Sequence, residues 1–132
     1  MEGTCFKKDP SEAFKWLTLA ANQKHAEAMH LLGLMYYNGQ GVTRDCAKAL
    51  QLCTSAANLG LASAQFALGQ CYYEGTCVKQ DFKEAYFWFT LAEKFGSKEA
   101  PKLGSKAKKA INKKDREIVA ERIKHWSVET AH

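Results

Sequence analysis

The chain repeats itself with a period of 36 residues, and this repeat limits the folds open to it more than any other feature. Residues 28–60 recur as residues 64–96 without an insertion. The residues that both copies share include Ala28, Gly33, Tyr36, Gly39, Asp45, Ala49, Ala56 and Gly60 of the first copy. Self-similarity at this length is typical of solenoid proteins, in which each copy is one supersecondary unit.

Each copy is predicted to be a helix, a turn and a second helix. Apolar residues in the first half of a copy fall at helical spacing, which places them on one face of an α-helix. In the first copy these core positions are Ala28, Leu31, Leu32, Met35 and Tyr36. Asp45 and Asp81 precede the second helices as N-cap acceptors. One such hairpin cannot bury its apolar faces alone, so the copies must stack.

The repeat resembles a known family. Residues 28–49 read AMHLLGLMYYNGQGVTRDCAKA, which is similar to the Sel-one-like repeat (SLR), a relative of the tetratricopeptide repeats. The second copy departs from the family at Cys77, where glycine is usual, and at Glu84, where lysine is frequent. The resemblance covers roughly residues 3–110. It implies an α-solenoid scaffold that binds other proteins, and it implies no reaction.

We therefore expect an all-α fold: a right-handed α/α solenoid of about seven antiparallel helices with a C-terminal capping helix. The chain is interpreted as a single repeat domain, residues 1–132. Within it we expect a partial repeat at 3–24, repeats at 25–60 and 61–96, and a divergent half repeat plus capping helix at 97–127.

The two ends of the array differ from the repeats between them. Asn112 is predicted to cap a final helix. Its apolar face, formed by Val119, Ile123 and Trp126, would close the open end of the core. The partial repeat at the other end lacks its first helix, which favours a fragment of a longer array over a natural terminus. One apolar flank of the helix that remains would be uncovered, and a homo-oligomer through this helix is one way to cover it.

Composition gives the broad class and a compartment. Hydrophobic residues make up 46% and charged residues 25%, as in ordinary soluble domains. No apolar run is long enough for a transmembrane helix, so membrane insertion is not expected. Residues 1–9 contain no signal-peptide pattern.

The disulfide-rich relatives of the family carry a cysteine pair in every repeat. Here none recurs, which favours reduced thiols and a cytoplasmic location.

Positive charge gathers near the C-terminus. Residues 1–97 carry nine basic and nine acidic side chains, whereas residues 98–125 carry ten basic and four acidic ones. One interpretation is a patch for nucleic acid or an acidic surface. Its residues would be Lys102, Lys106, Lys108, Lys109, Lys113 and Lys114. The other interpretation, which we favour, is a solvated cap, because carboxylates interrupt the lysines and no aromatic residue accompanies them.

No catalytic or metal-binding pattern is present in the sequence. His25 and His30 are five residues apart and do not share a helix face, and no second pair of ligands complements Cys71 and Cys77. No glycine-rich loop follows a strand as a phosphate site would require. We expect no metal, no cofactor and no enzymatic activity.

The resemblance places the first helix of each copy on a concave face, where a protein or peptide ligand would bind. The residues expected there are Glu27, His30, Leu34, Tyr37, Asn38, Ser63, Phe66, Gln70, Tyr73, Glu74, Glu99, Lys102, Lys106 and Lys109. Aromatic anchors beside charged groups suit a peptide groove. Tyr37 and Tyr73 could instead pack against the next repeat. The function expected is a non-catalytic scaffold or adaptor; the alternatives are the basic cap and a structural segment of a longer array.

Overall fold

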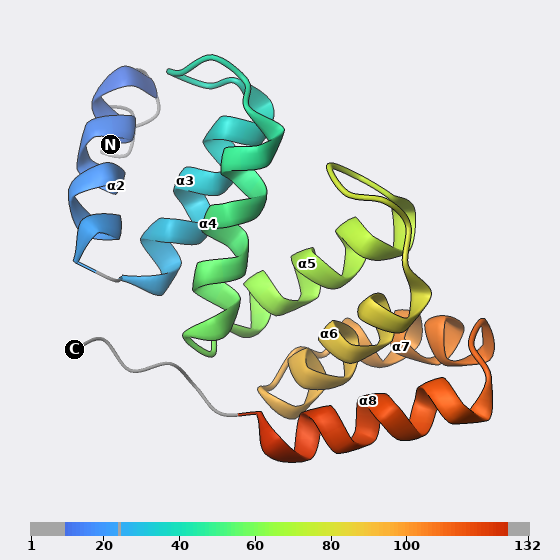
Figure 1. The fold of residues 1–132 in the computed structure, drawn as a ribbon. Helices are drawn as coiled ribbons and strands as arrows, with labels where there is room; N and C mark the ends of the chain where they lie inside the picture. Colours follow the sequence, from blue (N-terminus) through green and yellow to red (C-terminus); the bar gives the residue numbers. More distant parts are fainter. Residues whose placement is uncertain (1–9, 24, 127–132) are drawn as a thin grey trace. The chain divides into compact units, whose positions relative to one another are not determined.

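The computed structural model describes residues 10–23 and 25–126. Within these ranges the chain forms seven α-helices and no strand (Figure 1). The helices are α2 (Pro10–Asn22), α3 (Ala26–Asn38), α4 (Cys46–Asn58), α5 (Ala62–Glu74), α6 (Phe82–Lys94), α7 (Ala100–Lys109) and α8 (Lys113–His125). The expectation of about seven helices is confirmed. Residues 3–9 of the expected partial repeat lie outside the described residues.

The chain divides into two compact units, residues 1–56 and residues 57–132. The first unit holds α2, α3 and most of α4. The second holds the end of α4 and helices α5 to α8. We describe the packing of each unit separately.

The helix starts follow the expected capping chemistry. The Oδ1 atom of Asp81 accepts hydrogen bonds of 3.1 Å from the backbone N–H groups of Lys83 and Glu84. Asp45 accepts one of the same length from the Lys48 N–H. The Asn112 side chain accepts from the Asp115 N–H at 2.8 Å, so the predicted cap of α8 is confirmed. These bonds satisfy donors that a helix N-terminus cannot pair within the helix.

The turn after each first helix uses a left-handed backbone conformation. α3 ends at Gly39 with φ of 69° and α5 ends at Gly75 with φ of 75°. Two residues later, Gly41 has φ of 74° and its equivalent Cys77 has φ of 68°. Cys77 is the one non-glycine residue with positive φ in the described part of the chain. A side chain at such a position crowds the backbone, so glycine is the residue that fits there without strain.

The cysteines depart from the sequence expectation. Cys46 and Cys77 are disulfide-bonded, so the prediction of reduced thiols is wrong for these two residues. The prediction required a pair that recurs in every repeat, whereas a disulfide requires only two Cβ atoms at bonding distance. The reducing compartment inferred from the cysteines therefore loses its basis. Cys53 is buried and Cys71 half-buried, and both carry thiols.

Backbone strain at Cys77 predicts a measurable difference between two substitutions. Under reducing conditions, Cys77→Gly should unfold with a free energy about 1 kcal/mol higher than Cys77→Ser, because only glycine tolerates the left-handed conformation. Both variants lack the thiol, so the comparison isolates the backbone. Urea unfolding of the two proteins measures the difference, and equal stabilities would contradict the strain.

In the first unit, α3 packs against both α2 and α4. The rings of Phe14 and Tyr36 meet edge to face with centroids 5.6 Å apart. A Cβ atom on Gly33 would lie 3.2 Å from the Ala49 carbonyl oxygen, so α3 and α4 approach each other closely at this glycine. The prediction that Leu31 lies in the core is wrong. This side chain is exposed and Met29 is buried in its place, because the buried face of α3 lies further round the helix.

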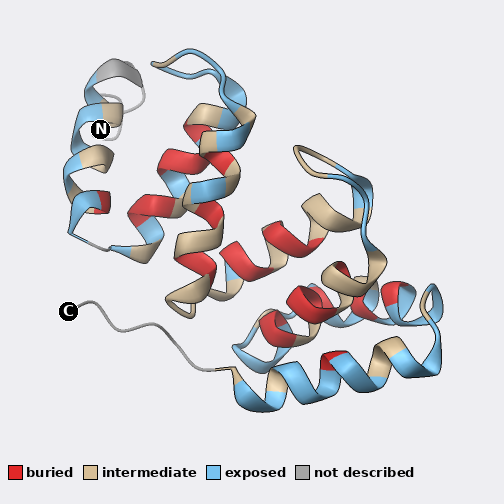
Figure 2. Ribbon diagram, viewed as in Figure 1, coloured by how far each residue is buried: buried red, intermediate tan, exposed pale blue. Residues whose placement is uncertain are grey.

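In the second unit, α6 is the central helix and α5, α7 and α8 pack against it. Figure 2 shows buried residues along α5 and α6 and a largely exposed outer face on α8. Phe87, Phe89 and Leu91 of α6 are among the largest fully buried side chains. Gly69 of α5 lies so close to Phe89 that an added Cβ would be 2.7 Å from its ring. The glycine is therefore required by packing rather than by its backbone conformation.

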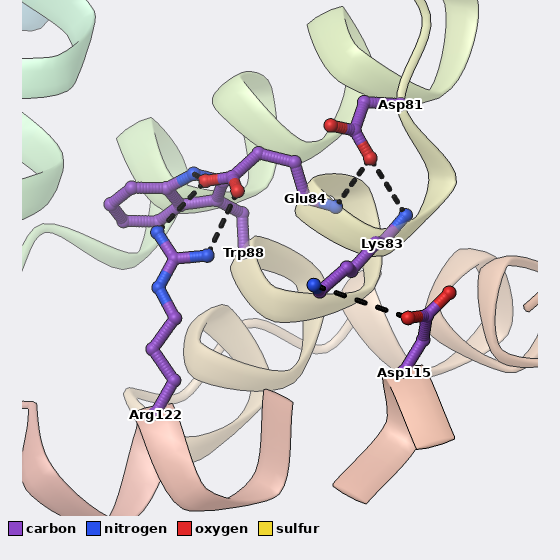
Figure 3. Close-up of polar contacts among 6 residues, drawn as sticks. All are labelled: Asp81, Lys83, Glu84, Trp88, Asp115 and Arg122. Atoms are coloured by element: carbon purple, nitrogen blue, oxygen red, sulfur yellow. Dashed lines mark hydrogen bonds and ion pairs between the residues drawn. The ribbon is translucent and has the colours of Figure 1, made fainter. Parts of the chain in front are cut away.

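The capping helix α8 docks on α6 through a buried side chain and a bidentate ion pair. Val119 is fully buried. Arg122 donates two hydrogen bonds to the Glu84 carboxylate, at 2.8 and 2.9 Å (Figure 3). Its guanidinium lies 3.8 Å from the centroid of the Phe87 ring. The Trp88 Nε1–H donates to Glu84 Oε1 at 3.2 Å. Glu84, a departure from the family pattern, therefore orients the residue that holds the cap.

We expect this ion pair to contribute on the order of 1 kcal/mol to the stability of the cap, since bidentate geometry lies at the upper end for partly exposed pairs. A double-mutant cycle with Glu84→Gln and Arg122→Ala, read by urea unfolding, measures the coupling. The Lys83–Asp115 pair joins the same two helices at 4.0 Å. A double-mutant cycle on Lys83 and Asp115 should give a coupling energy close to zero. If both pairs gave equal coupling energies, the bidentate geometry of the Glu84–Arg122 pair would not explain its contribution.

Candidate partner-binding surface

The face of α3 that carries the predicted site residues exposes large apolar side chains. Leu34 and Tyr37 are 42% and 36% exposed, and Leu31, which sequence reasoning assigned to the core, is 44% exposed. All three lie within one arc of the helix, because residues three and four apart are neighbours on a helix surface. Glu27 and Asn38 of the predicted site are also exposed and share this arc.

Tyr37 is held in place by the turn that follows α3. The Arg44 Nε–H donates to the Tyr37 carbonyl oxygen at 2.8 Å. The Arg44 guanidinium lies 5.1 Å from the centroid of the Tyr37 ring, a cation–π contact. In the second repeat, Gln80 donates to the Tyr73 carbonyl in the same way, at 2.8 Å. The turn thus brings a positive charge to the C-terminal end of the exposed face.

His30 lies at the border between this face and the core. Its ring is half-buried, and Nδ1 has no hydrogen-bond partner among the described residues. Burial lowers the pKa of the imidazole, and the nearby Glu27 carboxylate partly opposes that shift. His30 is therefore neutral at pH 7, and Glu27 supplies the charge at the N-terminal end of the face.

In the second unit the predicted aromatic anchors pack inward. The Phe66 ring lies 5.6 Å from Phe89, and the Tyr73 ring lies 5.3 Å from Phe82 and 6.1 Å from Phe89 (centroid distances). Phe66 and Tyr73 thus pack against α6 of their own repeat, whereas the alternative considered above was packing against the next repeat. The remaining predicted residues of α5 are polar: Ser63 and Glu74 are exposed and Gln70 is half-buried.

The predicted residues at α7 are all exposed. Lys102, Lys106 and Lys109 occupy one face of this helix, and Glu99 is the residue just before it. The opposite face buries Ala100, Gly104 and Ala107 against α6. These lysines form a charged surface, which differs in chemistry from the apolar face of α3.

α2 also exposes apolar side chains. Trp16 is 65% and Leu19 57% exposed, whereas the residues at the same positions two repeats later, Trp88 and Leu91, are buried. The uncovered flank expected from the sequence is thus present on α2. The homo-oligomer that would cover it stays a prediction.

The part of the chain that the structure describes contains neither a metal-binding cluster nor a membrane-spanning helix. No group of three or more His, Cys, Asp or Glu side chains is arranged to hold a metal ion. None of the described helices has the length and apolar character needed to cross a bilayer.

Comparison with known proteins places the fold. The structure is similar to a protective antigen present in uropathogenic Escherichia coli strains that displays an SLR fold, with a TM-score of 0.77 and 26% identity over 89% of this chain and 26% of that one. It is also similar to a Sel1 repeat protein from Oxalobacter formigenes, with a TM-score of 0.71 and 38% identity over 75% of this chain and 40% of that one. The chain thus spans less than half the length of either. No curated protein sequence matches it.

These similarities confirm the solenoid fold class. The sequence profile of the Sel1 repeat matches residues 1–25, 26–61 and 62–94. Sel1 repeats are in general scaffolds for protein–protein interaction. Because the profile covers well over half of the sequence, the chain belongs to the Sel1 repeat family.

Proposed function

We propose that the chain is a non-catalytic scaffold that binds a polypeptide through the exposed face of α3. The observation that carries the proposal is the division of this helix into two apolar faces. One face buries Ala28, Met29 and Leu32 in the first unit. The other exposes Leu31, Leu34 and Tyr37. Large apolar side chains that gather on an exposed surface are typical of a partner-binding site.

The charges at the two ends of this face favour one orientation of the partner. Glu27 lies in the first turn of α3, and Arg44 lies beside Tyr37 at the other end. A bound segment would place a basic residue near Glu27, apolar side chains on the leucines and an acidic residue near Arg44. Charge complementarity of this kind fixes register and orientation more than it adds affinity.

The equivalent face of α5 in the second unit is polar. Ser63, Gln70 and Glu74 occupy the positions of α5 that correspond to the exposed face of α3, while Phe66 and Tyr73 are engaged in packing. We therefore assign the binding site to α3 alone.

An arrayed library of amphipathic peptides, titrated with the full chain, tests the assignment. The Leu31→Ser/Leu34→Ser variant should bind the tightest peptide at least tenfold more weakly, a loss of about 1.4 kcal/mol. Ile118→Ser is the matched control, because Ile118 is also 42% exposed but lies on α8. Unchanged affinity in the double variant, with the fold intact, would refute the α3 site and favour a purely structural repeat segment.

A further inference from the structure

Six exposed lysines lie along α7 and beside the turn that joins it to α8, and we call this surface the lysine corner. Its members are Lys102, Lys106, Lys108, Lys109, Lys113 and Lys114. The backbone of the turn is fixed by two side chains. Asn112 caps α8, and the Arg116 Nε–H donates to the Lys108 carbonyl oxygen at 3.0 Å. The lysines therefore project from a defined scaffold.

The positive charge of the corner is not balanced by the chain's own carboxylates. The ion pairs found on this part of the described surface involve other cations, Lys83 with Asp115 and Arg122 with Glu84. Glu121 is in hydrogen-bond contact with the His125 ring at 2.8 Å. No ion pair within 4.0 Å is formed by a corner lysine in the described ranges. The ammonium groups are thus available to an external anion.

Local helix stability does not explain the placement of all six lysines. Lys106, Lys108 and Lys109 lie in the last turn of α7, where the helix dipole favours cations. Lys113 and Lys114 are the first two residues of α8, where the same dipole disfavours them. A residue choice that opposes local stability is expected where function requires it.

The surrounding side chains favour carboxylates over nucleic-acid phosphates as the ligand. Both arginines of α8, the residues best suited to bidentate phosphate contacts, are engaged within the protein: Arg116 on a backbone carbonyl and Arg122 on Glu84. The aromatic residues that flank α7 and α8 in the chain, Phe95 and Trp126, pack against each other with ring centroids 5.4 Å apart. α7 and α8 therefore offer no aromatic platform on which bases could stack.

We propose that the lysine corner docks an acidic segment, rich in Asp and Glu, of a protein partner. Lys102, Lys106 and Lys109 follow one face of α7, about 6 and 4.5 Å apart along the helix axis. Carboxylates on consecutive turns of a partner helix have similar spacing, so several pairs can form at once. This surface is independent of the α3 face and goes beyond the proposed function.

Fluorescence titration of the full chain with labelled poly-L-glutamate tests the proposal. The Lys102→Gln/Lys113→Gln/Lys114→Gln variant should bind at least tenfold more weakly. Its unfolding free energy should be unchanged or slightly higher, because two cations leave the N-terminus of α8. Lys15→Gln/Lys79→Gln/Lys94→Gln is the control, since it removes the same charge from exposed positions elsewhere.

The outcomes separate the partner classes. Specific weakening in the corner variant supports the proposal, and the Leu31→Ser/Leu34→Ser variant should still bind poly-L-glutamate, which keeps this test separate from the α3 site. Equal weakening in both lysine variants, or no binding of poly-L-glutamate, would overturn it. Tighter binding of a single-stranded oligonucleotide or of phosphatidylserine vesicles at the corner would also overturn it, in favour of a nucleic-acid or membrane surface.

Discussion

Phe89→Ala should lower the free energy of unfolding by about 3–5 kcal/mol, the range for truncating a fully buried phenylalanine. Phe89 is the largest member of the buried cluster on α6 and contacts the rings of Phe66 and Tyr73. Removing its ring leaves a cavity where α5 and α7 pack against α6. Urea unfolding followed by far-ultraviolet circular dichroism measures the loss.

Phe95→Ala is the matched control for this truncation. Phe95 lies at the end of α6, is partly exposed and makes one edge-to-face contact, with Trp126. Its loss should cost about 1 kcal/mol. If Phe89→Ala costs no more than Phe95→Ala, then α6 is not the centre of the second unit.

Gly69→Ala should destabilise the protein by about 1–3 kcal/mol, although alanine is normally the better helix former. The added Cβ would lie 2.7 and 2.8 Å from two carbon atoms of the Phe89 ring, which is closer than real Cβ contacts. Because that ring is fully buried, it can yield only by displacing its neighbours. Thermal or urea unfolding of the single variant shows the effect.

Gly104→Ala provides the opposite expectation on the other side of the same ring. Here the added Cβ would meet the Phe89 Cβ at 3.4 Å, an ordinary contact, so the change should be neutral or stabilise by about 0.5–1 kcal/mol.

In a Phe89→Ala background the cost of Gly69→Ala should disappear, since no ring remains to clash with. Strict additivity of the two changes would contradict the steric explanation.

The fold could be predicted because residues in each repeat mark where its helices begin and end. Asp81 and Asn112 are capping residues with few other roles at such positions, and both cap as expected. The glycine at the end of each first helix marks a turn by its backbone freedom. Leu31 shows what helical spacing cannot predict. Its spacing fits the buried face of the helix, but the side chain is exposed, because packing decides which edge of a broad apolar face is covered.

The candidate site was less accessible to sequence reasoning. Phe66 and Tyr73 occupy the same repeat positions as His30 and Tyr37, but Phe89 gives them an aromatic core to pack against. Periodicity cannot show such a difference between copies, because it depends on the neighbouring helix. The bonding of Cys46 and Cys77 was missed for a similar reason: it depends on distance in space and not on spacing in the chain.

Backbone amide hydrogen exchange of the full chain, with and without the tightest peptide from the library, tests the central claim most directly. If α3 is the binding surface, added protection should centre on residues 26–38 and the Arg44 turn, and it should vanish in the Leu31→Ser/Leu34→Ser variant. Protection that appears only on other helices, or persists unchanged in that variant, would contradict the account.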